Sequence, residues 1–305
     1  MSLRPVSIVV AALAITVASL APTFAEEGGE DAGPNLHHPV FSPDGRQVVF
    51  MSDRSGGDWE LFIATTDGQN VRRLTDHTGY DGYAIWSPDG TKLLFDRGED
   101  KIGKKKQPFV YDLKRAEARI LRTYETWVTG NEWVDEARLI GFREGSGPDA
   151  QRDLVWIDAR TGELTSLTDT PTIREGDAHL SHDRKTLYFV ETEGGHSSLA
   201  SLDLETESRR TLLKGQGRLY GIAVSPDGKR IAYNDVPEGE ENAEIYLYEI
   251  ASGRTERLTR NDAWDHMPVW TPDGSRLMFT SYRSGREEPY LMDPASGETY
   301  RLSFD

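Results

Sequence analysis

The sequence predicts an all-β fold, a six-bladed β-propeller whose blades are four-stranded antiparallel sheets. A turn motif recurs six times at intervals of 44 to 47 residues, and the six copies fill residues 36–305. Each interval contains short apolar runs separated by turn residues, enough for four strands. Four strands in a repeat of about 45 residues are typical of a propeller blade, whereas a solenoid would need one or two strands in a shorter repeat.

Residues 1–25 have the layout of a cleavable secretory signal. Arg4 is followed by an uncharged apolar run of about 16 residues, and small residues at Thr23 and Ala25 precede an acidic segment. The run is shorter than the roughly 20 residues that a membrane-spanning helix needs. We therefore expect cleavage after Ala25 and export to the periplasm or to the outside of the cell. No later segment approaches a spanning length.

Composition narrows the possible chemistry and partners. The chain has no cysteine, which excludes a disulfide framework, a thiolate metal site, a catalytic thiol and a lipidated N-terminal cysteine. Without residues 1–25 it would carry 34 basic and 51 acidic residues, a net charge of −17. Such a surface repels phosphate backbones, so we expect no nucleic acid partner. Residues 26–35 are acidic and Gly-rich, and we expect a linker without regular structure there.

The recurring motif is a Ser/Thr-Pro-Asp-Gly turn that marks the first hairpin of each blade. Proline presets φ at the second turn position, aspartate tolerates the third, and glycine takes the positive φ that closes the hairpin. Four copies are complete or nearly so, and two degenerate copies fill the gap between them. The copies begin at Ser42, Ser87, Val134, Ser181, Ser225 and Thr271.

Apolar runs around each turn supply the strands. In the first blade, residues 40–41 precede the turn and residues 48–50 follow it. A third run covers residues 61–63, and the fourth strand ends in a Leu-Thr pair at 74–75 that recurs in other blades. Further second strands are expected at 93–95, 187–189 and 277–279, and further third strands at 154–157 and 245–248. Short apolar runs of this kind between turn residues predict antiparallel sheet.

These motifs resemble the blade of the TolB-like propeller family. The resemblance rests on residues 41–45, 52–56, 73–75 and 86–90, and it extends over residues 36–305. It implies a propeller in an exported protein and raises a role in envelope assembly of the Tol-Pal kind. TolB itself has an α/β domain ahead of its propeller, and related peptidases have a hydrolase domain. Because about ten residues precede the first blade and none follow Asp305, we expect neither architecture here.

Variation between blades is confined to one face of the predicted disc. Turns between strands one and two, and between strands three and four, share one face and are uniformly short. The other connections share the opposite face and differ in every blade. Function tends to occupy variable loops on a rigid scaffold, so we place the site on this second face. Two charged runs on that face, residues 96–106 and 235–244, are expected to be solvated.

On the same face, the connections between blades carry polar side chains just before each innermost strand. Because innermost strands line the channel, these residues should form a ring around its mouth. The candidate binding residues are His37, His38, Asp81, Tyr83, Glu132, Asp177, His179, Tyr220, Asp265 and His266. Such a ring can hold a divalent cation, a small polar ligand or the end of a peptide. Alternatively, the side chains satisfy strand ends and one another, as buried polar groups usually do.

The motifs of common catalytic sites are missing from the sequence, which favours binding over chemistry. The sequence has no His-Glu-x-x-His, Gly-x-Ser-x-Gly, phosphate-loop or dinucleotide-binding motif. The leading hypothesis is an exported, monomeric, non-catalytic scaffold that binds an envelope or secreted protein, or a small polar ligand, at the channel mouth. One alternative is a metal-dependent lyase or hydrolase acting on an acidic saccharide. A second alternative is a Tol-Pal-like component of envelope assembly.

Overall fold

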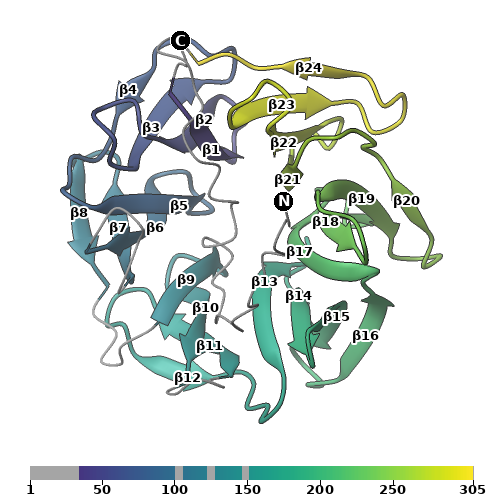
Figure 1. Cartoon of the computed structure of the whole chain (residues 1–305). Helices are drawn as coiled ribbons and strands as arrows, with labels where there is room; N and C mark the ends of the chain where they lie inside the picture. The colour runs from purple at the N-terminus through teal and green to yellow at the C-terminus, as the bar shows by residue number, and fades with distance from the viewer. Residues whose placement is uncertain (1–33, 100–105, 122–127, 146–150, 305) are drawn as a thin grey trace, which may run out of the picture.

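The computed structural model describes residues 34–99, 106–121, 128–145 and 151–304, and these residues form six four-stranded sheets. The sheets are arranged around a central axis as the blades of a disc (Figure 1). Within every sheet the strands pair antiparallel and follow the order of the chain, so each blade is one contiguous segment. The predicted six-bladed propeller is confirmed.

In each blade the first strand lies at the axis and the fourth at the rim (Figure 1). Blade 1 comprises β1 (Leu36–Phe41), β2 (Gln47–Ser52), β3 (Glu60–Thr65) and β4 (Arg72–Arg73), and blade 2 comprises β5 (Tyr80–Trp86), β6 (Lys92–Gly98), β7 (Gln107–Asp112) and β8 (Glu117–Ile120). Blade 3 comprises β9 (Val128–Trp133), β10 (Arg138–Glu144), β11 (Arg152–Asp158) and β12 (Leu164–Ser166), and blade 4 comprises β13 (Arg174–Leu180), β14 (Thr186–Glu193), β15 (His196–Asp203) and β16 (Arg209–Lys214). Blade 5 comprises β17 (Gly217–Val224), β18 (Arg230–Pro237), β19 (Glu244–Glu249) and β20 (Thr255–Arg257), and blade 6 comprises β21 (Asp265–Trp270), β22 (Leu277–Ser281), β23 (Glu288–Met292) and β24 (Thr299–Arg301).

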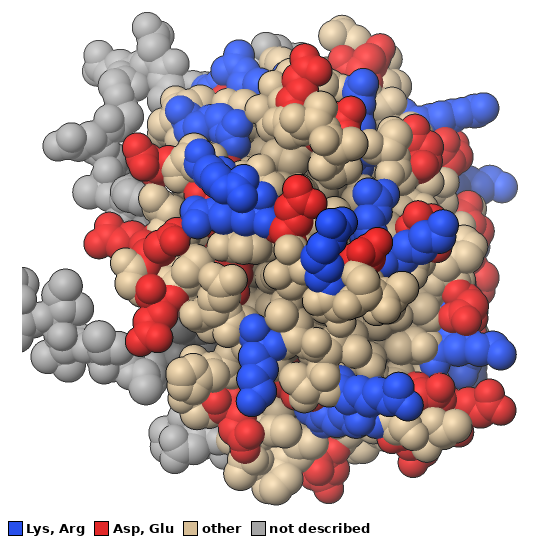
Figure 2. Space-filling view, turned by 90° about the vertical axis from the view of Figure 1, so that its right-hand side faces the viewer, with Lys and Arg blue, Asp and Glu red and all other residues tan. Residues whose placement is uncertain are grey.

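The expected secretory signal, residues 1–25, lies outside the described residues, as does the expected linker up to residue 33. Among the residues that are described, no helix has the length and apolar character needed to cross a membrane. The surface seen in Figure 2, over the blades on the right of Figure 1, interleaves acidic and basic side chains.

The hairpin turns have the predicted geometry, and they show why serine or threonine opens the motif. In blade 1 the Ser42 hydroxyl donates to Asp44 at 2.6 Å and accepts from the Gln47 amide at 2.9 Å, while Gly45 has φ of 69°. The same pair of bonds recurs at Ser87, Ser181, Ser225 and Thr271. One hydroxyl therefore provides a hydrogen-bond partner for both a carboxylate and a backbone amide of the tight turn.

The recurring Leu-Thr pair fastens the outermost strand to the third strand. Thr75 accepts from the amide of Leu61 at 3.0 Å and donates to the carboxylate of Glu60 through a short hydrogen bond. Glu60 is fully buried and also pairs with Arg73 at 2.9 Å. Blade 5 repeats this arrangement with Thr259, whose hydroxyl accepts from the Ile245 amide at 2.8 Å. A two-residue strand such as β4 thus gains side-chain anchors that its few ladder bonds do not supply.

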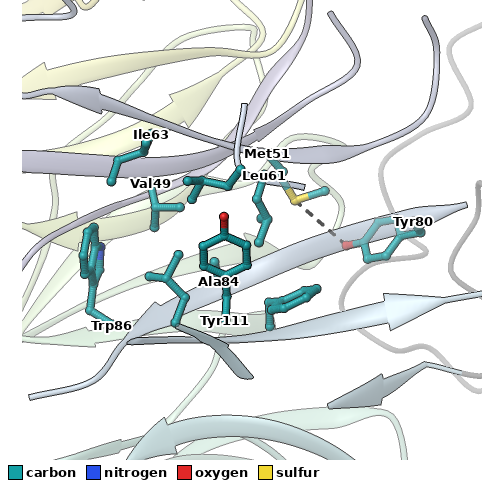
Figure 3. Close-up of a cluster of buried hydrophobic side chains, with 11 residues drawn as sticks. Val49, Met51, Leu61, Ile63, Tyr80, Ala84, Trp86 and Tyr111 are labelled. Carbon is teal, nitrogen blue, oxygen red and sulfur yellow. Dashed lines mark hydrogen bonds between the residues drawn. The ribbon is translucent and has the colours of Figure 1, made fainter. Parts of the chain in front are cut away.

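The hydrophobic core lies between neighbouring blades. Figure 3 shows Val49 and Ile63 of blade 1 facing Ala84, Trp86 and Tyr111 of blade 2. Similar clusters fill the other junctions. Each fully buried leucine or phenylalanine contributes about 1.5–3 kcal/mol relative to exposure, so these junctions are the main source of stability.

The ring closes by side-chain packing between blades 6 and 1, without exchange of a strand. Phe304, which is 1% exposed, packs on Phe50 of β2 with ring centroids 4.9 Å apart. Arg54 donates to the Phe304 carbonyl at 2.9 Å, and the Leu36 amide donates to the Glu287 carbonyl at 3.2 Å. Packing of the last residues on the first blade therefore completes the disc.

Candidate functional site

A β-bulge interrupts every innermost strand, and it determines which side chains reach the axis. The register of each first-to-second strand pairing shifts in the middle of the strand. In five blades the first bulged residue has a positive φ, a conformation that disfavours residues other than glycine. These residues are His38 (50°), Tyr83 (53°), Asp177 (44°), Gly221 (61°) and Met267 (55°).

The bulges correct the predicted position of the ring. The sequence predicted that the candidate residues lie in the connections before the innermost strands. All ten instead lie inside the innermost strands, β1, β5, β9, β13, β17 and β21. A bulge re-aims side chains within a strand, so residues in the strand itself face the channel. Strained φ values at equivalent positions around an axis are typical of functional sites.

The five bulged residues line one cavity of about 350 Å³ at the axis of the disc. Much of its wall is apolar and includes Val40, Ile85, Phe142, Ile222, Val269 and Trp270. Ionisable side chains of both signs complete the wall: Asp96, Lys106, Glu132, Arg152, Asp177 and His179. Apolar walls with a few convergent polar groups are characteristic of small-molecule sites of this size.

Glu132 and His179 form an ion pair at the cavity wall. The Nδ1 atom of His179 lies 3.0 Å from Oε2 of Glu132, which also accepts from the Leu180 amide at 3.3 Å. Burial works against a charged imidazole, but the Glu132 charge and hydrogen bond outweigh it and raise the pKa of His179. Asp177 likewise accepts from the amide of Gly221 at 3.0 Å. Both carboxylates therefore link neighbouring blades as well as lining the cavity.

His38 is held neutral in the same wall. Burial, together with the nearby His37 and His179, lowers the pKa of His38 to about 3. Its ring stacks edge-on against Tyr83 at 5.0 Å. Burial also raises the pKa of Tyr83 well above its usual value, so this phenol stays protonated.

Lys106 and Asp96 correct the expectation that the charged run 96–106 is solvated. Lys106 lies over the rings of Tyr80 and Tyr83, at 4.6 and 4.9 Å. Asp96 is 7% exposed, and burial raises its pKa to about 7 against the opposing influence of Lys106 and the Gly130 amide. The other run is also buried at its ends, since Asp235 and Glu244 are each 1% exposed. The remaining lysines of the first run, at 101, 104 and 105, lie outside the described residues.

Arg152 contributes a second buried cation, which sequence reasoning missed. Its Nε donates to the Glu175 carbonyl at 2.6 Å, and its guanidinium lies 4.7 Å from the ring centre of Phe142. A Cβ at position 176 would lie 2.3 Å from the guanidinium, so Gly176 leaves room for it. Burial lowers the pKa of Arg152 to about 10, and it remains charged at neutral pH.

Asp81 and Asp265 occupy buried ion pairs away from the cavity wall. Asp81 accepts from Arg97 at 2.7 and 2.6 Å. Asp265 accepts from Arg283 at 2.8 Å and from Asn261 at 2.7 Å. Tyr220 lies beside Arg218, whose guanidinium is 5.4 Å from the ring centre.

His37 and His266 do not line the cavity but approach each other across the junction of blades 1 and 6. Their ring centroids are 5.4 Å apart. Each Nε2 atom lies 3.7 Å from Oε1 of Glu287, a residue that carried no signal in the sequence. The structure thus divides the predicted ring into a cavity group, two aspartates in ion pairs, Tyr220 beside Arg218, and two histidines that meet at Glu287.

Fold and cavity together define a β-propeller with an axial cavity, and one such fold can host many unrelated functions. The chain belongs to the TolB β-propeller domain family, because the model of that family, described as TolB beta propeller domain, matches residues 12–176 and 177–305. The resemblance drawn from the blade motifs is confirmed.

Two solved structures share the fold. TolB from Acinetobacter baumannii is similar with a TM-score of 0.67 and 19% identity, covering 90% of this chain and 64% of that one. An oligogalacturonate lyase in complex with manganese is similar with a TM-score of 0.60 and 17% identity, covering 85% of this chain and 89% of the other. At these identities the likeness shows the fold alone.

Curated relatives are much longer proteins. Tricorn protease homolog 1 of Streptomyces coelicolor is 26% identical over 263 residues, which are 81% of this chain and 23% of the relative. The chain spans between 20% and 34% of the length of four curated relatives that it matches.

Proposed function

We propose that the chain is an exported, non-catalytic binding protein whose axial cavity takes a small polar ligand or the end of a peptide that carries both a positive and a negative group. The observation behind this proposal is the cavity of about 350 Å³, in which apolar walls surround ionisable groups of both signs. The signal-like layout of residues 1–25 supports a location in the periplasm or outside the cell.

The distribution of charge favours a zwitterionic ligand. Besides His179, which is paired with Glu132, the described cavity wall has the cations Lys106 and Arg152 and the carboxylate of Asp177. A ligand with one charge would leave the opposite set desolvated and poorly compensated, which costs binding free energy. A ligand with an ammonium and a carboxylate, as at peptide termini, satisfies both.

The protonation states of His38 and Tyr83 support binding rather than catalysis. With its pKa lowered to about 3, His38 is too weak a base to deprotonate a hydroxyl efficiently at neutral pH. Tyr83 keeps its proton because its pKa is raised. The His179–Glu132 pair is engaged in a hydrogen bond at 3.0 Å.

A ligand screen with blocked analogues tests the proposal. Thermal-shift assays on the purified chain would use tripeptides with both termini free, with the N-terminus acetylated, or with the C-terminus amidated. Free tripeptides should bind best, and isothermal titration calorimetry would give their Kd. Equal binding of all three forms, or binding of none, would argue against a zwitterion site.

Matched lysine variants locate the site. Lys106→Met should weaken the Kd at least about tenfold, because a lost hydrogen bond to a charged group costs roughly 1.5–3 kcal/mol. Lys185→Met makes the same change in an exposed hairpin turn of blade 4 that contributes no residue to the cavity wall, and it should leave the Kd unchanged. Equal losses in both variants would place binding elsewhere.

A further inference from the structure

The cluster at the ring closure is built from equivalent positions in the first and last blades. His37 in β1 and His266 in β21 each stand immediately before the bulged residue of their strand. Glu287 precedes β23, and its carbonyl accepts from the amide of Leu36 at the start of β1. The bulges therefore bring two imidazoles from opposite ends of the chain to one carboxylate.

The ligating atoms converge closely enough for a single ion. One ligating atom from each of the three side chains lies within 4.8 Å of the others, and both Nε2–Oε1 distances are 3.7 Å. Two ligands bound about 2.1 Å from a tetrahedral metal are about 3.4 Å apart, so only a small contraction is required. At 3.7 Å the same atoms are too far apart for hydrogen bonds.

Among the described residues, Glu287 lacks the arginine partner that several other buried carboxylates have, such as Glu60, Asp81 and Asp265. Glu287 is 4% exposed, and its Oε1 atom has no hydrogen-bond partner. The Nε2 atom of His266, a residue 6% exposed, also has none. By contrast, the neighbouring Glu288 is paired with Arg286 at 2.5 Å. A bound cation would satisfy both this buried acceptor and this buried nitrogen.

The surroundings suit a bound metal. Trp59, Trp264 and Tyr282 lie 6.2–6.5 Å from the two imidazoles and shield the cluster from water. Tyr282 also donates a hydrogen bond to the carboxylate of Glu287. A hydrogen bond to a ligating carboxylate fixes its orientation.

We propose that His37, His266 and Glu287 bind one divalent transition-metal ion, which links the first and last blades across the ring closure. Two imidazoles and one carboxylate favour Zn²⁺ and related first-row ions over Mg²⁺ and Ca²⁺, which prefer oxygen ligands. Three protein ligands leave a coordination position open for water or a ligand. The site is separate from the axial cavity and stands independently of its ligand.

Metal binding to the whole chain is the direct test. Elemental analysis before and after EDTA treatment would give the metal content, and calorimetry of the treated protein with Zn²⁺ and Mn²⁺ would give stoichiometry and Kd. We expect one ion per chain, a rise in Tm on adding Zn²⁺, and a visible absorption spectrum with Co²⁺ typical of four or five ligands. Equal affinity for Ca²⁺ or Mg²⁺, or absence of saturable binding, would overturn the proposal.

Matched variants assign the ligands. Glu287→Gln and His37→Ala should each weaken the Kd for Zn²⁺ by about 100-fold or more and abolish the Co²⁺ spectrum. Glu163→Gln and His196→Ala make the same changes at exposed positions and should leave both unchanged. Circular dichroism would establish that the variants fold, and if Glu287→Gln does not, His37→Ala decides. Unchanged binding in a folded cluster variant would refute the site.

Discussion

Individual charged residues near the axis are stabilised to very different degrees. Asp81 has an arginine within 2.7 Å, whereas Asp96 has only Lys106 and one backbone amide to offset its burial. Burial raises the pKa of Asp96 to about 7, so the folded state holds its proton more tightly than the unfolded chain does. Ionisation of Asp96 therefore opposes folding.

This difference sets a pH dependence of stability. Between about pH 4 and pH 7 the folded state binds more protons at Asp96 than the unfolded state, so the contribution of this residue to stability falls as the pH rises. Asp96→Asn removes the effect. Relative to the wild type, the variant should gain on the order of a few kcal/mol between pH 4 and pH 8. Urea unfolding across this range measures the difference, and parallel curves for the two proteins would contradict the prediction.

At the scale of the strand, side-chain anchors compensate for short ladders. Strand β4 has two residues, and Thr75 beyond its end joins the Leu61 amide to the buried carboxylate of Glu60. The hydroxyl is both acceptor and donor here, so a residue of the same shape without it would leave two buried polar groups unsatisfied.

Replacing this threonine tests the anchor. Thr75→Val keeps the volume and should lower the free energy of unfolding by about 2–3 kcal/mol, since a buried donor and a charged acceptor each lose a partner. Thr75→Ser retains the hydroxyl and should recover most of that loss. Chemical denaturation of both variants gives the comparison, and equal stability of the two would show that the hydroxyl contributes little.

The strands could be predicted from sequence, but their bulges could not. Turn residues and apolar runs are local signals, and they located the hairpins at Ser42 and its equivalents correctly. A bulge is a mismatch between two strands, so the positive φ of Asp177 or Met267 depends on the pairing partner and leaves no local mark. For that reason the polar ring was predicted in loops instead of inside strands.

At the scale of the whole molecule, the disc depends on the junction between its two ends. Phe304 packs on Phe50, and Arg54 binds the carbonyl of Phe304. Because no strand is exchanged between blades 6 and 1, these side-chain contacts have to hold the ring closed.

Removing the terminal aromatic ring tests this dependence. Phe304→Ala should cost about 3 kcal/mol, the lower end of the range for buried phenylalanine. Tyr300→Ala, in the outermost strand with a side chain 39% exposed, should cost less than about 1 kcal/mol. Differential scanning calorimetry would compare them. Similar Tm values for both variants would mean that the terminal contact does not hold the ring.

The number of blades could be predicted by counting the repeats in the sequence. Much of the candidate site could be recognised only in the folded structure. His37, Asp177 and His179 were found because they occur beside a repeated motif. Glu287 and Arg152 were missed, since each stands near a third strand whose sequence has no distinctive polar pattern. Position in the repeat also could not separate Asp265, which pairs with Arg283, from the residues that face the cavity.

The uninterrupted blades have a consequence for how the molecule is assembled in time. Each sheet draws all four strands from about 45 consecutive residues, so its ladder can be completed as soon as those residues are available. No blade synthesised early depends on a strand from a later part of the chain to complete its sheet. Only the contacts of the last blade and the final residues with the first blade turn a row of finished sheets into a circle.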